Sequence, residues 1–293
     1  MRPIFIDEDV NILFGPAAQQ QLTKRNDRRY LDQEGGVLVV PQERWASAQR
    51  AERAHWMRLG IRAQDDRNRQ HFEGFRRFAV LRGRRFEHAL EIGCGPFTNL
   101  RIIGRACKID RCTLLDPLIL SYLSHPYCYY DENLLDLEPS GLPGRVARKL
   151  FPRFFRAIQR ALGRCIPVAS LEPTPIESYG VAGPFDMVIM INVLEHCFDG
   201  RRVFERALGA CRPGSVFVFL DRLYDARPLS DELALRFDAA HPLKIDRKIV
   251  TDFLVGNFDD MFVDVLPRTT RCLPEEAAAR WDEIFFIGTR KAA

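Results

Sequence analysis

Apolar runs and helical repeats alternate along the chain from residue 86 onward. The run at residues 185–191 is almost continuously apolar, which is typical of a parallel strand buried on both faces. Helical repeats follow at residues 200–210, 230–238 and 246–256. Strands are predicted at residues 88–92, 111–116, 166–170, 185–191, 215–221, 261–266 and 283–288. This alternation predicts an α/β fold with a doubly wound parallel sheet.

The first 85 residues are predicted to form a mainly helical extension. Three short apolar stretches, at residues 4–6, 11–14 and 36–40, could form strands. A helical repeat runs from Pro41 to Gly60, and a second helix is expected from residue 65 or 66 to residue 81, ending at Gly83. The residues at helical spacing are Trp45, Ala48, Glu52, Trp56 and Leu59 in the first helix and Phe72, Phe75, Phe78 and Ala79 in the second. We expect residues 1–85 to cover a crevice of the domain formed by residues 86–293.

Residues 121–165 form an insertion between the second and third predicted strands. Its first part is rich in tyrosine, which could shape a polar pocket or pack at the surface. Residues 145–164 are amphipathic, and Pro152 predicts a break or kink in the helix. The apolar face carries Val146, Leu150, Phe151, Phe154, Phe155, Ile158 and Leu162, and the basic face carries Arg145, Arg148, Lys149, Arg153, Arg156, Arg160 and Arg164. Such a segment could pack on its own domain, close as a lid, contact a substrate or an anionic membrane, or bind a protein partner.

Composition and charge narrow the class of protein. The 293 residues are 46% apolar and 28% charged, as in a globular protein, and no apolar stretch approaches the roughly 18 residues of a membrane span. The first residues carry acids where a signal peptide needs an apolar core, so we expect a cytoplasmic protein. A net charge of +4 is too small to indicate a nucleic-acid partner. The eight cysteines form no Cys-x-x-Cys pair and are expected to be buried thiols.

The most informative segment is the glycine turn at residues 89–100. An apolar run ends at Glu91, passes through Gly93 and Gly95, and is expected to restart as a helix at a Thr98 or Asn99 cap. Such a joint presents backbone N–H groups to a ligand without an obstructing side chain. Asp116 ends the next strand about twenty residues later, the spacing at which an acid accepts ribose hydroxyls. The pair predicts a site for a nucleotide-like cofactor.

Two cofactor classes use such a crevice, dinucleotides and S-adenosylmethionine. A dinucleotide site normally has a third glycine for close helix packing, and that position holds Thr98 here. Glu91 would be unfavourable beside a pyrophosphate, whereas it suits the ammonium and sulfonium of S-adenosylmethionine. The residues favour the methyl donor.

Four elements in order resemble the class I S-adenosylmethionine-dependent methyltransferases. They are Glu91-x-Gly93-x-Gly95, then Asp116, then residues 185–188 leading into Asn192-Val193-Leu194-Glu195-His196, and then Arg212-Pro213-Gly214. The resemblance covers residues 86–221 and implies a Rossmann-like seven-stranded sheet whose last strand is antiparallel. It also implies roles for cofactor-binding residues. Gly93 and Gly95 would pass under the methionine and ribose, Glu91 would lie near the amino group directly or through water, Asp116 would hold the ribose, Glu177 would meet the adenine amine, and Asn192 would face the methionine or the acceptor.

Two histidines are candidates for catalysis. His196 follows the fourth predicted strand and is the first candidate for a general base, with His241 second; each could instead fix a helix or a loop. Some members of the family bind a divalent ion through Glu-x-x-Glu-His and a later histidine. Here Asn192 stands where the first carboxylate would be, which removes a charge that a hard cation needs, so no metal site is expected.

The sequence therefore predicts an enzyme that methylates an oxygen or nitrogen of a small-molecule biosynthetic intermediate, such as a sugar or a specialised metabolite. The alternatives are the same reaction on a lipid-linked or membrane-presented acceptor, a nicotinamide-dependent oxidoreductase, and a non-catalytic cofactor-binding protein. A homo-oligomer is compatible with the sequence.

Overall fold

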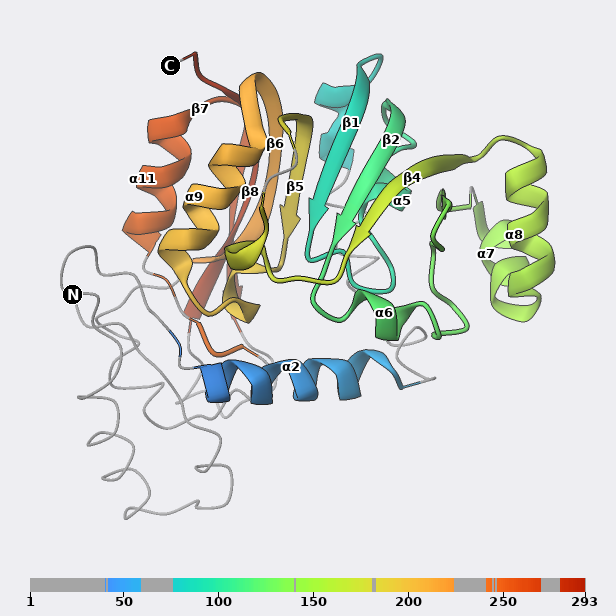
Figure 1. Cartoon of the computed structure of the whole chain (residues 1–293). Helices are drawn as coiled ribbons and strands as arrows, with labels where there is room; N and C mark the ends of the chain where they lie inside the picture. Colours follow the sequence, from blue (N-terminus) through green and yellow to red (C-terminus); the bar gives the residue numbers. More distant parts are fainter. Residues whose placement is uncertain are drawn as a thin grey trace.

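The computed structural model describes residues 40, 42–58, 76–139, 141–180, 183–223, 241–243, 245, 247–269 and 280–292. Its centre is one eight-stranded sheet with the order β3-β4-β2-β1-β5-β6-β8-β7 (Figure 1). Strands β4, β2, β1, β5 and β6 run parallel to one another, whereas β3 pairs antiparallel with β4, β8 with β6, and β7 with β8. The strands are β1 (Arg85–Ile92), β2 (Lys108–Leu115), β3 (Leu134–Asp136), β4 (Cys165–Glu172), β5 (Phe185–Ile191), β6 (Cys211–Leu223), β7 (Phe258–Thr269) and β8 (Arg280–Arg290).

Both faces of the sheet are covered, so its central strands are apolar on both sides. Side chains of β6 alternate between the faces: Phe217 and Phe219 join one hydrophobic cluster, and Val216 and Val218 join the other. Helices α9 (Gly200–Ala210) and α11 (Arg247–Asn257) pack on the first cluster. The short helices η2 (Arg76–Leu81) and α5 (Leu100–Ile103) pack on the second. This arrangement confirms the doubly wound α/β fold.

All seven predicted strands are present, most of them longer than predicted, and β3 from the insertion adds an eighth at the edge. The prediction of an α-helix burying Ala79 is wrong in the described part, because residues 76–81 form a 3-10 helix in which Ala79 is exposed. The chain then turns at Gly83, whose φ of 76° suits glycine. The candidate strands at 4–6 and 11–14, most of the one at 36–40, Phe72, Phe75 and the helix at 230–238 lie outside the described residues.

Helix α2 (Gln42–Trp56) confirms the first N-terminal helix and lies across the ends of the central strands (Figure 1). It is attached to the loop after β5. Trp45 Nε1 donates to the carbonyl of His196 at 3.0 Å, and the Trp45 ring meets Phe198 edge-on with 5.2 Å between centroids. The helix thus covers the carboxyl ends of the parallel strands, where ligand-binding loops lie in such sheets. The division into an extension at 1–85 and a domain at 86–293 stays a prediction.

The insertion contains two helices, α7 (Gly141–Leu150) and α8 (Pro152–Ala161), which lie beyond the end of the sheet formed by β3 and β4 (Figure 1). The break predicted at Pro152 is confirmed. Three tyrosines of the preceding segment are buried rather than at the surface, namely Tyr122, Tyr129 and Tyr130.

Two general properties of the described residues complete the fold. Among them, no helix combines the length and the apolar character needed to cross a bilayer. The seven cysteines that the structure describes are free thiols, and all but Cys165 are buried. Burial raises the pKa of several of these thiols, including Cys107 to about 12, so they are inert packing residues.

Candidate functional site

A cavity lies beneath α2 where the carboxyl ends of the central parallel strands meet. It encloses about 930 Å³ of space, part of it open to solvent. Its walls come from α2 (Trp45, Gln49, Glu52, Trp56), the glycine turn (92–97, Asn99, Arg101), the end of β2 (115–118), Tyr122, the loop after β4 (175–177) and the loop after β5 (191–193, His196, Cys197).

The glycine turn requires its two glycines for different reasons. Gly93 and Gly95 have φ values of 67° and 53°, in the left-handed region that favours glycine. A Cβ atom at Gly93 would overlap the side chain of Val193, whereas a Cβ at Gly95 would meet nothing within 4 Å. Gly93 therefore permits close approach to the loop after β5, and Gly95 leaves open space at the cavity wall.

Glu91 holds the glycine turn from beneath. Its Oε1 accepts from the Asn99 amide at 2.6 Å, and its Oε2 accepts from the Leu100 amide at 3.2 Å and from the Thr98 hydroxyl. Burial raises the pKa of Glu91, against the lowering effect of these hydrogen bonds. Of the two expected capping residues, Asn99 makes no side-chain cap to the four-residue helix α5, whereas the Thr98 hydroxyl oxygen accepts from the Leu100 amide at 3.2 Å. Glu91 does not line the cavity, so its contact with a cofactor amino group stays a prediction.

Asp116 joins the glycine turn to the end of β2. Its Oδ2 accepts from the Gly95 amide at 3.0 Å, and its Oδ1 accepts from the Leu118 amide at 2.8 Å. Burial raises the pKa of Asp116 to about 7, and the negative charges of Glu52 and Glu91 add to this effect. A carboxylate has about four lone-pair directions, so both oxygens can still accept from hydroxyls in the cavity.

Glu177 lies in the short helix η3 (Ile176–Ser178) and is 2% exposed. Its Oε1 accepts from the amides of Phe198 and Asp199 at 2.6 and 3.2 Å. Its Oε2 is buried and has no hydrogen-bond partner among the described residues, although the residue lines the cavity. Burial raises the pKa of Glu177. A buried carboxyl oxygen without a partner is costly, which indicates that a ligand completes the site.

Asn192 follows β5 with a φ of 56°, a left-handed conformation that is uncommon outside glycine. Its amide donates to the carbonyl of Leu220 at 2.7 Å, and the residue lines the cavity. Uncommon backbone conformations that the surrounding structure enforces are concentrated at functional sites. The geometry agrees with a residue held in place to face a ligand.

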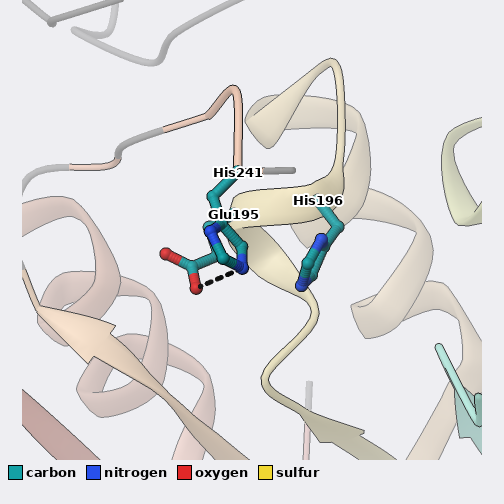
Figure 2. Close-up of side chains that lie close together, drawn as sticks. All are labelled: Glu195, His196 and His241. Atoms are coloured by element: carbon teal, nitrogen blue, oxygen red, sulfur yellow. Dashed lines mark ion pairs between the residues drawn. The ribbon is translucent and has the colours of Figure 1, made fainter. Parts of the chain in front are cut away.

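The two candidate histidines lie side by side, as Figure 2 shows. His196, in the short helix η4 (Leu194–His196), lines the cavity, and its ring centroid is 4.5 Å from that of His241. His196 Nδ1 is 3.8 Å from Glu52 Oε2. On the other side, His241 Nε2 is 3.5 Å from Glu195 Oε1. The histidines are thus flanked by a carboxylate at each end.

Glu195, His196 and His241 also present ligand atoms within 4.8 Å of one another, a spacing that could hold a metal ion. The Arg222 guanidinium, however, lies 2.9 Å from Glu195 Oε1, and its positive charge balances the negative charge of that carboxylate. A divalent ion would have to displace this ion pair or sit beside a cation. The expected absence of a metal site stays a prediction.

Sequence reasoning missed the polar wall that α2 contributes. Gln49 and Glu52 line the cavity together with the tryptophans, and the spacing 45, 49, 52, 56 places them on one helix face. It also missed Asp221, whose Oδ2 accepts from the amides of Val193 and Leu194 at 3.0 and 2.7 Å. Burial and the charge of Glu195 raise the pKa of Asp221 to about 7. The only signal in the sequence was an acid at the end of an apolar strand.

No protein-family model and no curated protein matches this chain. Among solved structures, it is similar to the N-methyltransferase NodS from Bradyrhizobium japonicum WM9 in complex with S-adenosylhomocysteine, at 14% identity and a TM-score of 0.49, covering 85% of this chain and 99% of NodS. It is also similar to the YcgJ protein from Bacillus subtilis, at 13% identity and a TM-score of 0.47, covering 76% and 100%. A third similar structure is the Burkholderia thailandensis 1,6-didemethyltoxoflavin-N1-methyltransferase, at 13% identity and a TM-score of 0.41, covering 90% of this chain and 99% of that enzyme. At these identities, a function has to be argued from the residues of the cavity itself.

Proposed function

We propose that the protein transfers a methyl group from S-adenosylmethionine to an oxygen or nitrogen of a small-molecule acceptor. The observation that carries the proposal is the position of Glu91. A dinucleotide site offers free N–H groups at a helix N-terminus to the pyrophosphate. Here the Asn99 and Leu100 amides already donate to Glu91. A pyrophosphate would therefore lack these donors, whereas S-adenosylmethionine has no phosphate to place there.

The other cavity residues support the same donor. Asp116 would accept the two ribose hydroxyls beside Gly95, and the unpartnered Oε2 of Glu177 would accept from the adenine amine. Gly93 and Gly95 would lie under the methionine and ribose, and Asn192 would face the methionine or the acceptor. These residues come from separate strand ends and meet around one cavity.

The chemistry demands little from the protein. When bound, S-adenosylmethionine supplies an electrophilic methyl group on a sulfonium, and S-adenosylhomocysteine is the by-product. The chain has to hold the acceptor in line, to exclude water and to remove a proton. Helix α2 covers the cavity, which suits a small acceptor. His196 is the first candidate for the base, since it lines the cavity between Glu52 and His241. His241 does not line the cavity; it would hold His196 in position or pass on the proton that His196 removes.

The test combines binding and turnover. Calorimetric titration should show one S-adenosylhomocysteine bound per chain and no binding of NADH. Incubation with S-adenosylmethionine and a panel of hydroxylated and aminated metabolites should then yield an acceptor that is one methyl group heavier. With that acceptor, His196→Gln should lower kcat by about 10²-fold or more while leaving S-adenosylhomocysteine affinity unchanged. Binding of NADH in place of S-adenosylhomocysteine would refute the proposal, and full activity of His196→Gln would dismiss it as the base.

A second candidate is the same reaction on a lipid-linked or membrane-presented acceptor. It is favoured by the exposed apolar side chains of α7 and α8, such as Phe154 at 70% exposure. An assay with and without vesicles distinguishes the two candidate functions. A membrane-presented acceptor should be methylated in vesicles, whereas a small metabolite should be methylated without them.

A further inference from the structure

The described residues expose their large apolar side chains unevenly. Ten large hydrophobic residues are exposed, and six of them fall between residues 146 and 162. We call these six residues the hairpin patch, after the pair of consecutive helices α7 and α8 that carries it. Their exposed fractions are 46% for Val146, 62% for Leu150, 63% for Phe151, 70% for Phe154, 39% for Ile158 and 58% for Leu162. Clustered exposure of this kind marks an interaction surface, whereas single exposed apolar residues need no explanation.

The patch points outward because α8 is fixed to the body of the protein by its opposite side. Phe155 and Gln159 are buried. Arg156 Nε is 2.7 Å from the buried carboxylate of Asp136, and Arg160 pairs with Asp131. Residues 154, 158 and 162 follow at intervals of four and share one stripe of the helix. The two helices lie beyond the end of the sheet formed by β3 and β4, far from α11 (Figure 1). The patch is therefore anchored and cannot turn inward without breaking these ion pairs.

The charge around the patch identifies its partner. Between Glu138 and Glu172 the chain contains seven arginines and lysines and no acid. Arg156 and Arg160 are neutralised by Asp131 and Asp136, but Arg153 and Arg164 are exposed. A second copy of the chain would bring the same positive charge to the interface and be repelled. An anionic lipid surface offers both phosphates for the arginines and an apolar layer for the side chains.

We propose that the hairpin patch docks the protein on the surface of an anionic bilayer, with the apolar side chains inserted among the lipids and the exposed arginines at the phosphates. This docking does not depend on the reaction in the cavity. It would hold the protein at the membrane as a peripheral protein.

Vesicle sedimentation tests the proposal. The full chain is mixed with vesicles of phosphatidylcholine alone or of phosphatidylcholine with phosphatidylglycerol. It should sediment with the anionic vesicles only, and less in high salt, because salt screens the arginines. Leu150→Asp and Phe154→Asp should each lower the partition coefficient about tenfold or more, since each removes an apolar side chain from the lipid.

Leu120→Asp is the matched control, because Leu120 is also 62% exposed but lies on α6 (Ile119–Tyr122), outside the patch. It should sediment like the unaltered protein, and all variants should keep their thermal unfolding temperature. Failure of the unaltered protein to bind anionic vesicles would overturn the proposal. So would an equal loss in Leu120→Asp. A dimer in light scattering that Phe154→Asp dissociates, without any vesicle binding, would reassign the patch to contact between copies.

Discussion

At the scale of single residues, the cavity depends on buried acids that are held by backbone amides. Asp116, Glu177 and Asp221 each accept from two or more backbone amides of the loops that follow the parallel strands. Each also has a raised pKa because it is buried. These acids keep the loops in place and, in Asp116 and Glu177, present acceptors to a ligand.

Cofactor affinity should depend on pH through Asp116. Its pKa of about 7 means that the carboxyl is protonated at lower pH and cannot accept both ribose hydroxyls. Affinity for S-adenosylhomocysteine should therefore rise by up to about tenfold per pH unit below 7 and level off above it. Titration calorimetry across this range measures the effect. Asp116→Asn should bind more weakly at high pH and remove the dependence; a persistent slope in that variant would assign the dependence to another group.

The raised pKa of Asp116 makes the stability of the fold change with pH in the opposite direction to cofactor affinity. Because its pKa is higher in the folded than in the unfolded chain, the folded state binds the extra proton. The contribution of this group to the free energy of unfolding is greatest below pH 4 and is lost as the pH rises through 7.

Activity should survive removal of divalent metal. The Glu195 carboxylate is already paired with Arg222 at 2.9 Å, so its negative charge needs no divalent ion to balance it. Methyl transfer measured after dialysis against EDTA should match that of the untreated enzyme. Loss of turnover that Mg²⁺ or Mn²⁺ restores would show that the Glu195, His196 and His241 cluster binds a metal.

At the scale of elements, the joint between β1 and α5 depends on one side chain. Glu91→Ala would leave the Asn99 amide and the Thr98 hydroxyl without their acceptor, and the Leu100 amide with Thr98 Oγ1 as its one remaining acceptor. The free energy of unfolding should fall by about 2–4 kcal/mol, as measured by urea denaturation. Glu87→Ala, at an exposed position of the same strand, is the control and should change it by less than about 0.5 kcal/mol. Equal stability of the two variants would contradict the role given to Glu91.

The elements differ in how well the sequence predicts them. The strands follow from apolar runs such as 185–191, because a strand buried on both faces admits few polar residues. The break at Pro152 follows from the missing amide of proline. In contrast, β3 is only three residues long, and residues 76–81 form a 3-10 helix, which the spacing of apolar residues does not distinguish from an α-helix. The sequence predicts that this helix covers a crevice, but a helical stripe does not say which polar side chains, here Gln49 and Glu52, face the cavity.

At the scale of the whole molecule, the parallel sheet brings residues from distant parts of the chain together at the carboxyl ends of its strands. The sequence predicts Gly93, Gly95, Asp116, Glu177 and Asn192 as site residues, and the structure brings all five to one cavity beneath α2. Their proposed contacts with a cofactor depend on the ligand and stay predictions. The hydrogen bonds of Glu91 and the pairing of Glu195 with Arg222 could not be predicted, because both depend on side-chain positions that only the folded chain defines.

The most direct test is a pair of crystal structures of the protein soaked with S-adenosylhomocysteine and with NADH. We expect S-adenosylhomocysteine in the cavity beneath α2, with its ribose hydroxyls at Asp116 and its adenine amine towards Oε2 of Glu177, and an empty cavity in the NADH crystal. A dinucleotide in the cavity, with S-adenosylhomocysteine absent from its own crystal, would contradict the account.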